Sequence, residues 1–401
     1  MFQTPGLSHL PVASIAPPIA AGTPVVVLVH HVHREQWPVV YDRVRSRIGW
    51  WIESQLAPRL YRDCTYVAVS DRTSAELAEL GLTALYVPEA HGGMGMGPVE
   101  GMVVQESLGR SLVMEPLAQT LLCSAVLAQH APEALQAACL PAIAAGELLP
   151  VLAHQEPRAR YNLTQCATQA QAQGDHFLLT GHKSVVPGGD RAHAWIVPAV
   201  LDARMALFWV SAKDVGVARS YVTQDGARAG ELPLANTPAQ LITREGDLVL
   251  RQAVDIGIAL ACAEAVGLMD RSVAITAEYL NTRKQFGVVI ASFQALRHRA
   301  ADMKMQLELA RSMSYYASLK LKAPEAERRQ AIARARYQLG NAMRFVGQSA
   351  VQLHGGIGVT DEYIVSHYFK KLTQLEMTFG DTLHHLGEVS NRMQDTAGVF
   401  A

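Results

Sequence analysis

The sequence has little of what marks several common functional classes. Its five cysteines are scattered and form no CxxC pair, which argues against a disulfide framework and a zinc site. The formal net charge is only -1, so nothing favours nucleic acid or an anionic membrane as a partner. Charged residues are sparse at 18% and hydrophobic residues reach 49%, as in globular proteins with buried cores.

The N-terminal region also lacks targeting signals. Its most apolar stretch, "PPIAAGTPVVVLVHH", is interrupted by prolines and falls short of the ~20 residues that a membrane span needs. The opening "MFQTPGLSHL" has no basic segment, so we expect no secretory signal and a cytoplasmic location. The cluster His30, His31 and His33 has no carboxylate or cysteine spaced to complete a metal site, and we expect no metal.

What is present divides the chain into four zones. Residues 1–75 hold two β-like runs (Val25–Val29 and "TYVAVS") around a tryptophan-rich segment, and residues 76–148 indicate helices joined by a glycine-rich loop. Residues 149–248 change toward period two, with Gly174 and Asp175 as a hairpin turn. Residues 249–401 indicate a bundle of long helices. This order predicts an α+β fold.

The clearest helix follows Ser292. Apolar residues recur there at spacings of three and four, which predicts one buried face: Leu296, Ala300, Met303, Leu307 and Ala310. The preceding helix is predicted over Val254–Asn281 and is stopped by Gly287.

Four segments carry a family resemblance when taken in order. They are "LTALYVPEAHGGMGMGPVEGMVVQESLGRSL", "EPRARYNLTQCATQAQAQGDHFLLTGHKSVV", "TRKQFGVVIASFQALRHRAAD" and "QLHGGIGVTDEY". Over about residues 76–395 the chain resembles the FAD-dependent acyl-CoA dehydrogenase family. "TQDGARAGEL", "FVGQSAVQLHGGIG" and "FGDTLHHL" look like the branch that includes the pimeloyl-CoA dehydrogenase small subunit. The resemblance implies an N-terminal helical domain, a middle antiparallel β-domain and a C-terminal four-helix bundle.

The resemblance also implies an FAD site and its residues. A flavin dinucleotide needs a cationic fork, hydrogen-bonding amides, flat apolar surfaces and close backbone approach at its phosphates. Arg283 offers the fork, and Gly355 and Gly356 the close approach. The remaining candidates are Gln285, Phe286, Phe293, Gln294, Gln352 and His354. In the family the Arg283 group serves the FAD of a neighbouring subunit, which implies a homo- or hetero-tetramer. For Arg283 alone, a helix-end arginine that offsets the macrodipole is the competing interpretation.

The chemistry implied is α,β-dehydrogenation of an acyl-CoA thioester, in which a carboxylate removes the α-proton. The family usually places its glutamate where this chain has Phe379, followed by Gly380. Some members place it near the start of the long helix, where this chain has Gly257. Both positions are empty, and the nearest carboxylates are Asp381 and, as a weaker alternative, Asp255. His384 and His385 beside Asp381 are either a solvated helix start or neighbours of flavin or substrate.

Other segments depart from the family pattern as well. In "KSVVPGG", Val185 replaces the flavin-side tryptophan and Pro187 the hydroxyl residue, and "EPRARYN" replaces a glycine-rich loop. Residues 25–75 resemble a fragment of a GT-B glycosyltransferase, with the join near Ser74–Gly81, but no second domain is present to bind a sugar nucleotide.

Three functional hypotheses remain open at this point. The first is an FAD-dependent acyl-CoA dehydrogenase, as the small subunit of a heteromeric enzyme with an acyl-CoA substrate and an electron-transfer acceptor. The second is a catalytically inert scaffold subunit that completes a partner's FAD site. The third, which we discount, is a glycosyltransferase-related fragment. The acyl group cannot be read from these residues.

Overall fold

The computed structural model describes residues 26–28, 65–67, 77–174 and 176–396. It divides into two units, Met1–Glu76 and Leu77–Ala401. In the first unit, β1 (Val26–Leu28) and β2 (Thr65–Val67) pair in parallel and fall on the two predicted β-like runs. The tryptophan-rich segment and the three histidines at 30–33 lie outside the described residues.

The second unit opens with short helices. Two 3-10 turns, η2 (Leu82–Ala84) and η3 (Glu89–His91), precede α5 (Pro98–Arg110), α6 (Leu117–His130) and α7 (Glu133–Ala144). Helix α6 is buried on nearly all sides; Leu121, Leu122 and Leu127 are inaccessible to solvent. Its apolar residues share one core with the C-terminal helices, so the two helical regions pack as one body.

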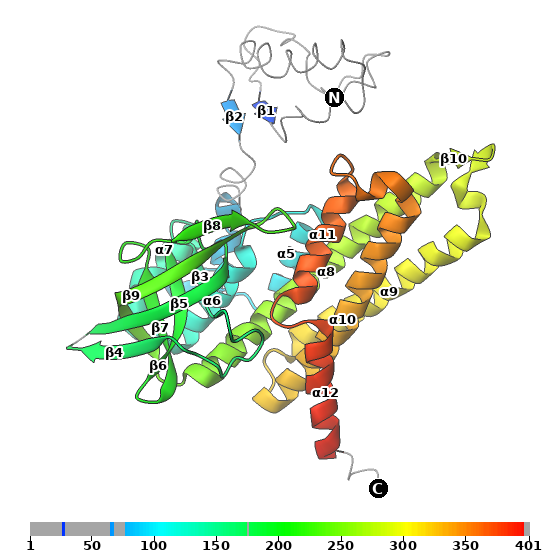
Figure 1. Cartoon of the computed structure of the whole chain (residues 1–401). Helices are drawn as coiled ribbons and strands as arrows, with labels where there is room; N and C mark the ends of the chain where they lie inside the picture. Colours follow the sequence, from blue (N-terminus) through cyan, green and yellow to red (C-terminus); the bar gives the residue numbers. More distant parts are fainter. Residues whose placement is uncertain (1–25, 29–64, 68–76, 175, 397–401) are drawn as a thin grey trace. The chain divides into compact units, whose positions relative to one another are not determined.

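The middle segment is a small, nearly closed sheet (green in Figure 1). Its strands are β3 (Pro150–Leu152), β4 (Gln169–Gln173), β5 (His176–Pro187), β6 (Ala194–Leu201), β7 (Arg204–Ser211), β8 (Arg219–Val222) and β9 (Arg228–Thr243). The pairings join β6, β4, β5, β9 and β7 into a ring because β7 also pairs β6. Trp195 and Phe208 fill its core. The predicted hairpin is confirmed: β4 and β5 are antiparallel, with Gln173 opposite His176.

The C-terminal segment is the predicted bundle of long helices. It contains α8 (Gly246–Thr282), α9 (Gln294–Lys320), α10 (Glu325–His354), α11 (Ile364–Met377) and α12 (Thr382–Thr396). Met303, Leu307 and Ala310 are fully buried, so the predicted face of α9 is confirmed. Helix α8 begins eight residues before the predicted start at Val254, and it ends at Thr282, one residue after the predicted end. The predicted α+β class is confirmed.

Among the described helices, α8 is the one long and apolar enough to cross a membrane. However, 89% of its most apolar window is buried inside the protein. It contacts α5, α6, α9, α10 and α11, and Figure 1 shows it running through the middle of the helical assembly. Helix α8 is therefore the core helix on which the other helices pack.

A buried ion pair fixes the loop that follows β3. Lys183 Nζ donates to Glu156 Oε1 at 2.6 Å, and both side chains are almost fully excluded from solvent. The same carboxylate accepts hydrogen bonds from Thr168 Oγ1 at 2.7 Å and from the Ala167 N–H at 2.7 Å. Burial opposes the ionisation of Glu156, but the Lys183, Thr168 and Ala167 contacts together outweigh it and lower the Glu156 pKa to about 2. The pair therefore anchors the 156–168 loop to β5.

We predict that Glu156→Gln lowers the free energy of unfolding at pH 7 by about 3–5 kcal/mol, because it leaves the Lys183 ammonium buried without a counter-charge. The folded-state pKa lies below the ordinary value of 4.5, so the stabilisation from ionised Glu156 is present above pH 4.5. It is lost as the pH falls from 4.5 toward 2. Denaturant unfolding at pH 7 and pH 3 should thus show a smaller gap between wild type and variant at pH 3. Glu147→Gln, at an exposed carboxylate, is the control; an equal gap at both pH values contradicts the prediction.

Candidate functional site

The residues that the sequence assigned to FAD gather at one end of the bundle, in segments 283–294 and 352–356 (the bundle end). Arg283 ends α8, and Lys284–Gln285 (β10) pairs with Val288–Val289 (β11) in a two-residue hairpin. Phe286 takes φ 51 in its turn and is 92% exposed, with its ring edge-on to Phe293 at 6.1 Å. All the predicted residues except His354 are exposed to solvent. Aromatic rings and a guanidinium left open at one end of a molecule indicate a surface that another group covers.

The two segments of the bundle end are held together by aromatic contacts. Tyr279, one turn before Arg283, donates its hydroxyl to the His354 carbonyl at 3.3 Å, and the two rings lie 4.4 Å apart. His354 Nε2 is buried and has no partner among the described residues. A Cβ built on Gly355 or Gly356 meets nothing within 4 Å, so the turn is open to a close approach. A guanidinium, amides, an unpaired ring nitrogen and an open glycine turn fit a pyrophosphate, and the exposed rings fit an adenine.

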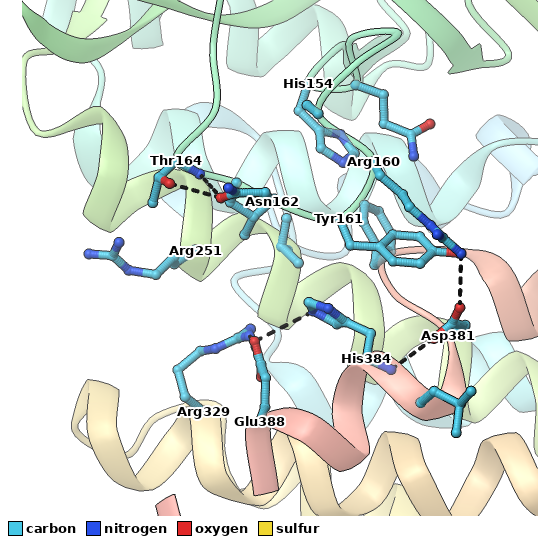
Figure 2. A pocket seen from close by; sticks show the side chains of 16 residues that line it. His154, Arg160, Tyr161, Asn162, Thr164, Arg251, Arg329, Asp381, His384 and Glu388 are labelled. Atoms are coloured by element: carbon cyan, nitrogen blue, oxygen red, sulfur yellow. Dashed lines mark hydrogen bonds and ion pairs between the residues drawn. The ribbon is translucent and has the colours of Figure 1, made fainter. Parts of the chain in front are cut away.

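A second site lies at a cavity of about 800 Å³ between the 154–164 loop, α8, α10 and α12. Figure 2 shows Arg160, Tyr161 and Asn162 on the loop side, and Asp381, His384 and Glu388 on the α12 side. Eleven of its sixteen lining residues are polar or charged. The cavity therefore has a polar wall on more than one side, together with an apolar floor at Val254 and Phe379.

Both base positions of the family meet at this floor. Phe379 occupies one of them, and a Cβ built on Gly257, the other, would lie 2.6 Å from Phe379 Cε2. The Phe379 ring also stacks on His154, with centroids 5.5 Å apart and planes 23° apart. His385 Nε2 lies 3.2 Å from the Phe379 carbonyl oxygen and donates to it, which helps to hold Phe379 at φ 58. An aromatic ring thus fills the space where a carboxylate would act.

Of the two replacement carboxylates, the cavity holds Asp381. Its Oδ1 accepts the backbone N–H of His384 at 2.8 Å, the contact of an N-cap at the start of α12. Its Oδ2 lies 3.7 Å from the Arg160 guanidinium. One oxygen of Asp381 therefore serves the helix and the other faces the cavity. His384 also lines the cavity, where its ring lies 5.4 Å from that of Tyr161, whereas His385 is buried.

The structure does not bring Asp255 to the cavity. It is inaccessible to solvent, Arg328 Nε donates to its Oδ2 at 2.8 Å, and Arg329 donates to its Oδ1. A carboxylate enclosed by two guanidiniums cannot collect a proton from a ligand, so the weaker alternative is corrected here: Asp255 is a structural ion-pair partner. Sequence spacing could not reveal this, because both arginines come from α10, more than seventy positions away.

The strand face that carries the flavin-side tryptophan in the family is altered. Val185 takes φ 49, which is strained for a β-branched residue, and it sits between Lys183 and Val186, where the β5–β9 register shifts. It is 40% exposed, and Pro187 follows at the end of β5. Neither residue lines the cavity. At these two described positions of β5, a valine and a proline therefore stand where the resemblance implies a flat ring and a hydroxyl.

The cavity residues that were missed from the sequence include three charged ones from different helices: Arg251, Arg329 and Glu388. Arg329 Nη2 donates to both Glu388 oxygens at 2.7 Å, and Arg251 Nε donates to Glu325 at 2.8 Å. Their helices, α8, α10 and α12, converge only in the fold. A charged residue at an otherwise apolar helix position, such as Arg329 beside Ala331 and Ile332, was the one available signal.

Family comparisons agree with this geometry. The profile described as "Acyl-CoA dehydrogenase, C-terminal domain" matches residues 245–394, and the one described as "Acyl-CoA dehydrogenase, N-terminal domain" matches residues 43–147. Together they cover more than half of the chain.

Individual relatives give the same result. "Acyl-CoA dehydrogenase FadE27" of Mycobacterium tuberculosis is 28% identical over 80% of this chain and 87% of that protein. "Glutaryl-CoA dehydrogenase" of Desulfococcus multivorans is 26% identical over 76% of this chain and 83% of that protein.

Solved structures match with similar coverage. A variant of the "Tcur3481-Tcur3483 steroid ACAD" has a TM-score of 0.76 and 28% identity over 82% of this chain and 90% of that chain. The "ChsE4-ChsE5 complex" from Mycobacterium tuberculosis has a TM-score of 0.75 and 27% identity over 81% of this chain and 89% of that chain.

Fold, bundle end and cavity together define a flavin-dependent dehydrogenase of the helical–β–helical class. The chain belongs to the acyl-CoA dehydrogenase family, whose cofactor is FAD. The N-terminal match begins at residue 43, inside the segment that resembles a GT-B glycosyltransferase, so that resemblance is not confirmed. The small-subunit branch is likewise not confirmed.

We predict that Gly257→Ala destabilises the protein, although alanine is favoured over glycine in a helix by about 1 kcal/mol. The new methyl group must displace the Phe379 ring, at a cost of about 1–3 kcal/mol. In a Phe379→Ala background the same substitution should instead be neutral or stabilising. Denaturant unfolding of the four proteins in this cycle measures the coupling. An equal gain in both backgrounds would mean that the ring does not occupy the floor of the cavity.

Proposed function

We propose that this chain acts as one subunit of a heteromeric FAD-dependent acyl-CoA dehydrogenase. The family reaction is α,β-dehydrogenation of an acyl-CoA thioester, in which FAD, when bound, accepts the β-hydrogen as a hydride. In this proposal the bundle end of the chain completes the FAD site of a partner subunit from the same family. The chain's own cavity lacks the glutamate that removes the α-proton.

The residue roles follow from the described contacts. At the bundle end, Arg283 binds phosphate through its planar fork, and Phe286 with Phe293 offers ring faces for stacking. The Tyr279–His354 contact positions the glycine turn. At the cavity, Phe379 excludes water from the floor and supplies no proton acceptor.

The Phe379–Gly257 contact is the observation that carries the proposal. One lost carboxylate could be replaced from the family's other position, but here each position excludes the other: the ring at 379 fits only because residue 257 has no side chain. The altered β5 face at Val185 and Pro187 adds a second loss in the same chain. An exposed FAD-binding surface, together with a cavity that has no base at either family position, is the pattern expected of a dependent subunit.

Two solved relatives support an assembly of this kind. Both are named for two components, Tcur3481 with Tcur3483 and ChsE4 with ChsE5. We infer that the partner of this chain is a second acyl-CoA dehydrogenase subunit, in a tetramer, and that electrons leave through a separate electron-transfer acceptor. The resemblance to the pimeloyl-CoA dehydrogenase small subunit agrees with this inference. A cytoplasmic location is part of the proposal.

The second candidate is a self-sufficient dehydrogenase in which Asp381 is the base. The observation in its favour is that Asp381 Oδ2 faces the cavity. Aspartate is one methylene shorter than glutamate, and a misplacement of about 1 Å can cost ~10²-fold in rate. The two candidates differ in one assay. The purified chain without a partner should show acyl-CoA-dependent bleaching of flavin absorbance only if it is self-sufficient.

A glycosyltransferase-related role for residues 25–75 is the weakest candidate. Parallel pairing of β1 with β2 is compatible with a strand–crossover–strand unit, but the dehydrogenase match from residue 43 overlaps the same segment. Sugar-nucleotide binding by the chain would revive it.

We predict that Arg283→Gln weakens FAD retention by the heteromeric complex by about 1.5–3 kcal/mol, the typical contribution of a hydrogen bond to a charged group. Flavin fluorescence released during dialysis, with the complex still assembled, measures the loss. Arg204→Gln is the control, because Arg204 is an exposed arginine on β7, away from the bundle end. Equal flavin retention in all three complexes would refute the role of the bundle end.

A further inference from the structure

The cavity is lined by three arginines, and two of them form close ion pairs between helices. Arg329 is bound between Asp255 and both oxygens of Glu388, and Arg251 Nε donates to Glu325 at 2.8 Å. These two guanidiniums hold α8, α10 and α12 together, Arg329 through both of its terminal nitrogens and Arg251 through Nε.

The third arginine, Arg160, is different. Its ion-pair partner across the cavity is Asp381, at 3.7 Å, the longest ion-pair distance among the cavity residues. The side chain is 79% exposed, and its guanidinium lies over the Tyr161 ring at 5.3 Å from the centroid. Figure 2 shows it extending past Tyr161 toward Asp381. Among the described residues its partners are Asp381 and Tyr161, so a guanidinium with five N–H donors keeps donors for a ligand.

The backbone of Arg160 is a second, independent observation. Its φ is 47, in the left-handed region that glycine adopts without strain. The family has a glycine-rich loop where this chain has "EPRARYN", so an arginine stands where the backbone favours glycine. Strained residues of this kind are found at ligand-binding positions, where the surrounding structure holds them in place. Here the Glu156–Lys183 ion pair anchors the start of the same loop.

We propose that Arg160 is the residue with which the cavity binds an oxyanion of its acyl-CoA ligand. This rests on the proposed function, since that function makes an acyl-CoA the ligand. The oxyanion is a carboxylate at the far end of the acyl group or a phosphate of the CoA moiety. Both accept two parallel N–H bonds from a guanidinium. Arg160 and its neighbour Asn162 make the loop side of the cavity polar, so an ionised group can be hydrogen-bonded there.

Asp381 competes with the ligand for the same guanidinium. Its Oδ2 faces Arg160, whereas its Oδ1 is held by the His384 N–H. A ligand oxyanion must therefore displace Asp381 Oδ2 from the guanidinium, and the negative charge of Asp381 then lies near the bound ligand and repels it. Removing the Arg160 guanidinium should lower the affinity for the ligand, and neutralising Asp381 should raise it. A general change in cavity shape would not produce these opposite effects.

The test is isothermal titration of thioesters into the full chain, with its partner subunit where the two co-purify. Each pair of probes joins a monoacid thioester to the diacid thioester of the same chain length, from pentanoyl-CoA with glutaryl-CoA to octanoyl-CoA with suberyl-CoA. The corresponding N-acetylcysteamine thioesters, which lack phosphate, form a second set of probes. Arg160→Gln should weaken binding of the anionic ligand about five- to tenfold, because it removes a charge-assisted hydrogen bond whose strength is reduced by solvent screening. Asp381→Asn should tighten the same ligand.

The pairs distinguish the two sources of the oxyanion. If the acyl carboxylate is bound, Arg160→Gln removes a preference for the diacid thioester, with or without CoA. If a CoA phosphate is bound, the variant weakens both acyl-CoA classes equally and leaves the N-acetylcysteamine thioesters unchanged. Either pattern supports the proposal.

Controls separate ligand binding from folding and from general charge. Arg158→Gln removes an exposed arginine of the same loop that does not line the cavity, and it should change no affinity. Arg160→Gly relieves the backbone strain, so it should match or exceed the wild-type thermal midpoint while binding as poorly as Arg160→Gln. The proposal is overturned if Arg160→Gln leaves every affinity unchanged, if Arg158→Gln acts equally, or if no thioester binds. A complex without flavin would refute the proposed function instead, whatever the titrations give.

Discussion

The contact between the Phe379 ring and the bare backbone of Gly257 is the constraint on which this account depends. It joins the turn before α12 to the core helix α8, so the floor of the cavity belongs to the core of the protein. A well-packed core transmits a change at one position to its neighbours. A glutamate at 257 would collide with the ring, and the ring itself replaces the glutamate at 379. The two positions that the family uses alternately have changed together.

The charged side chains around that floor mostly form ion pairs that join helices, and few of them are placed to transfer a proton. Asp255, Arg328, Arg329 and Glu388 form a chain of ion pairs that ties α8 and α10 to α12. Burial lowers the pKa of His154 to about 4, with the nearby Lys183 charge as a smaller cause, so its ring is neutral at pH 7. The free capacity is found elsewhere: in Arg160 at the cavity and in the exposed rings, guanidinium and glycine turn of the bundle end. We therefore propose that ligand binding and completion of a partner's FAD site use two separate surfaces of one chain.

The sequence predicted the parts whose signal is local. The apolar spacing along 296–310, the hairpin at Gly174 and the order of helices and strands each reflect contacts that repeat over a few residues. The bundle-end residues were found because two short motifs carry them. The pairing of Phe379 with Gly257 was not predicted, although both vacancies were noted, because 122 positions separate them in the chain.

Other features depended on tertiary contacts that no local pattern encodes. Asp255 looked like a free carboxylate until α10 supplied two guanidiniums. Arg160 looked like an ordinary loop residue until its positive φ and its position over Tyr161 were known. The first 75 residues resembled another family because short β-like runs are shared by many folds, and the dehydrogenase match begins inside that segment.

The central claim is that this chain completes a partner's flavin site and does not build a working site of its own. Native mass spectrometry of the intact assembly, which counts chains and flavins together, tests it most directly. The account predicts a heteromeric tetramer with one FAD for every two chains, and no flavin on the chain purified alone. A homomeric assembly of this chain with one FAD per chain, reduced on addition of an acyl-CoA, would contradict it.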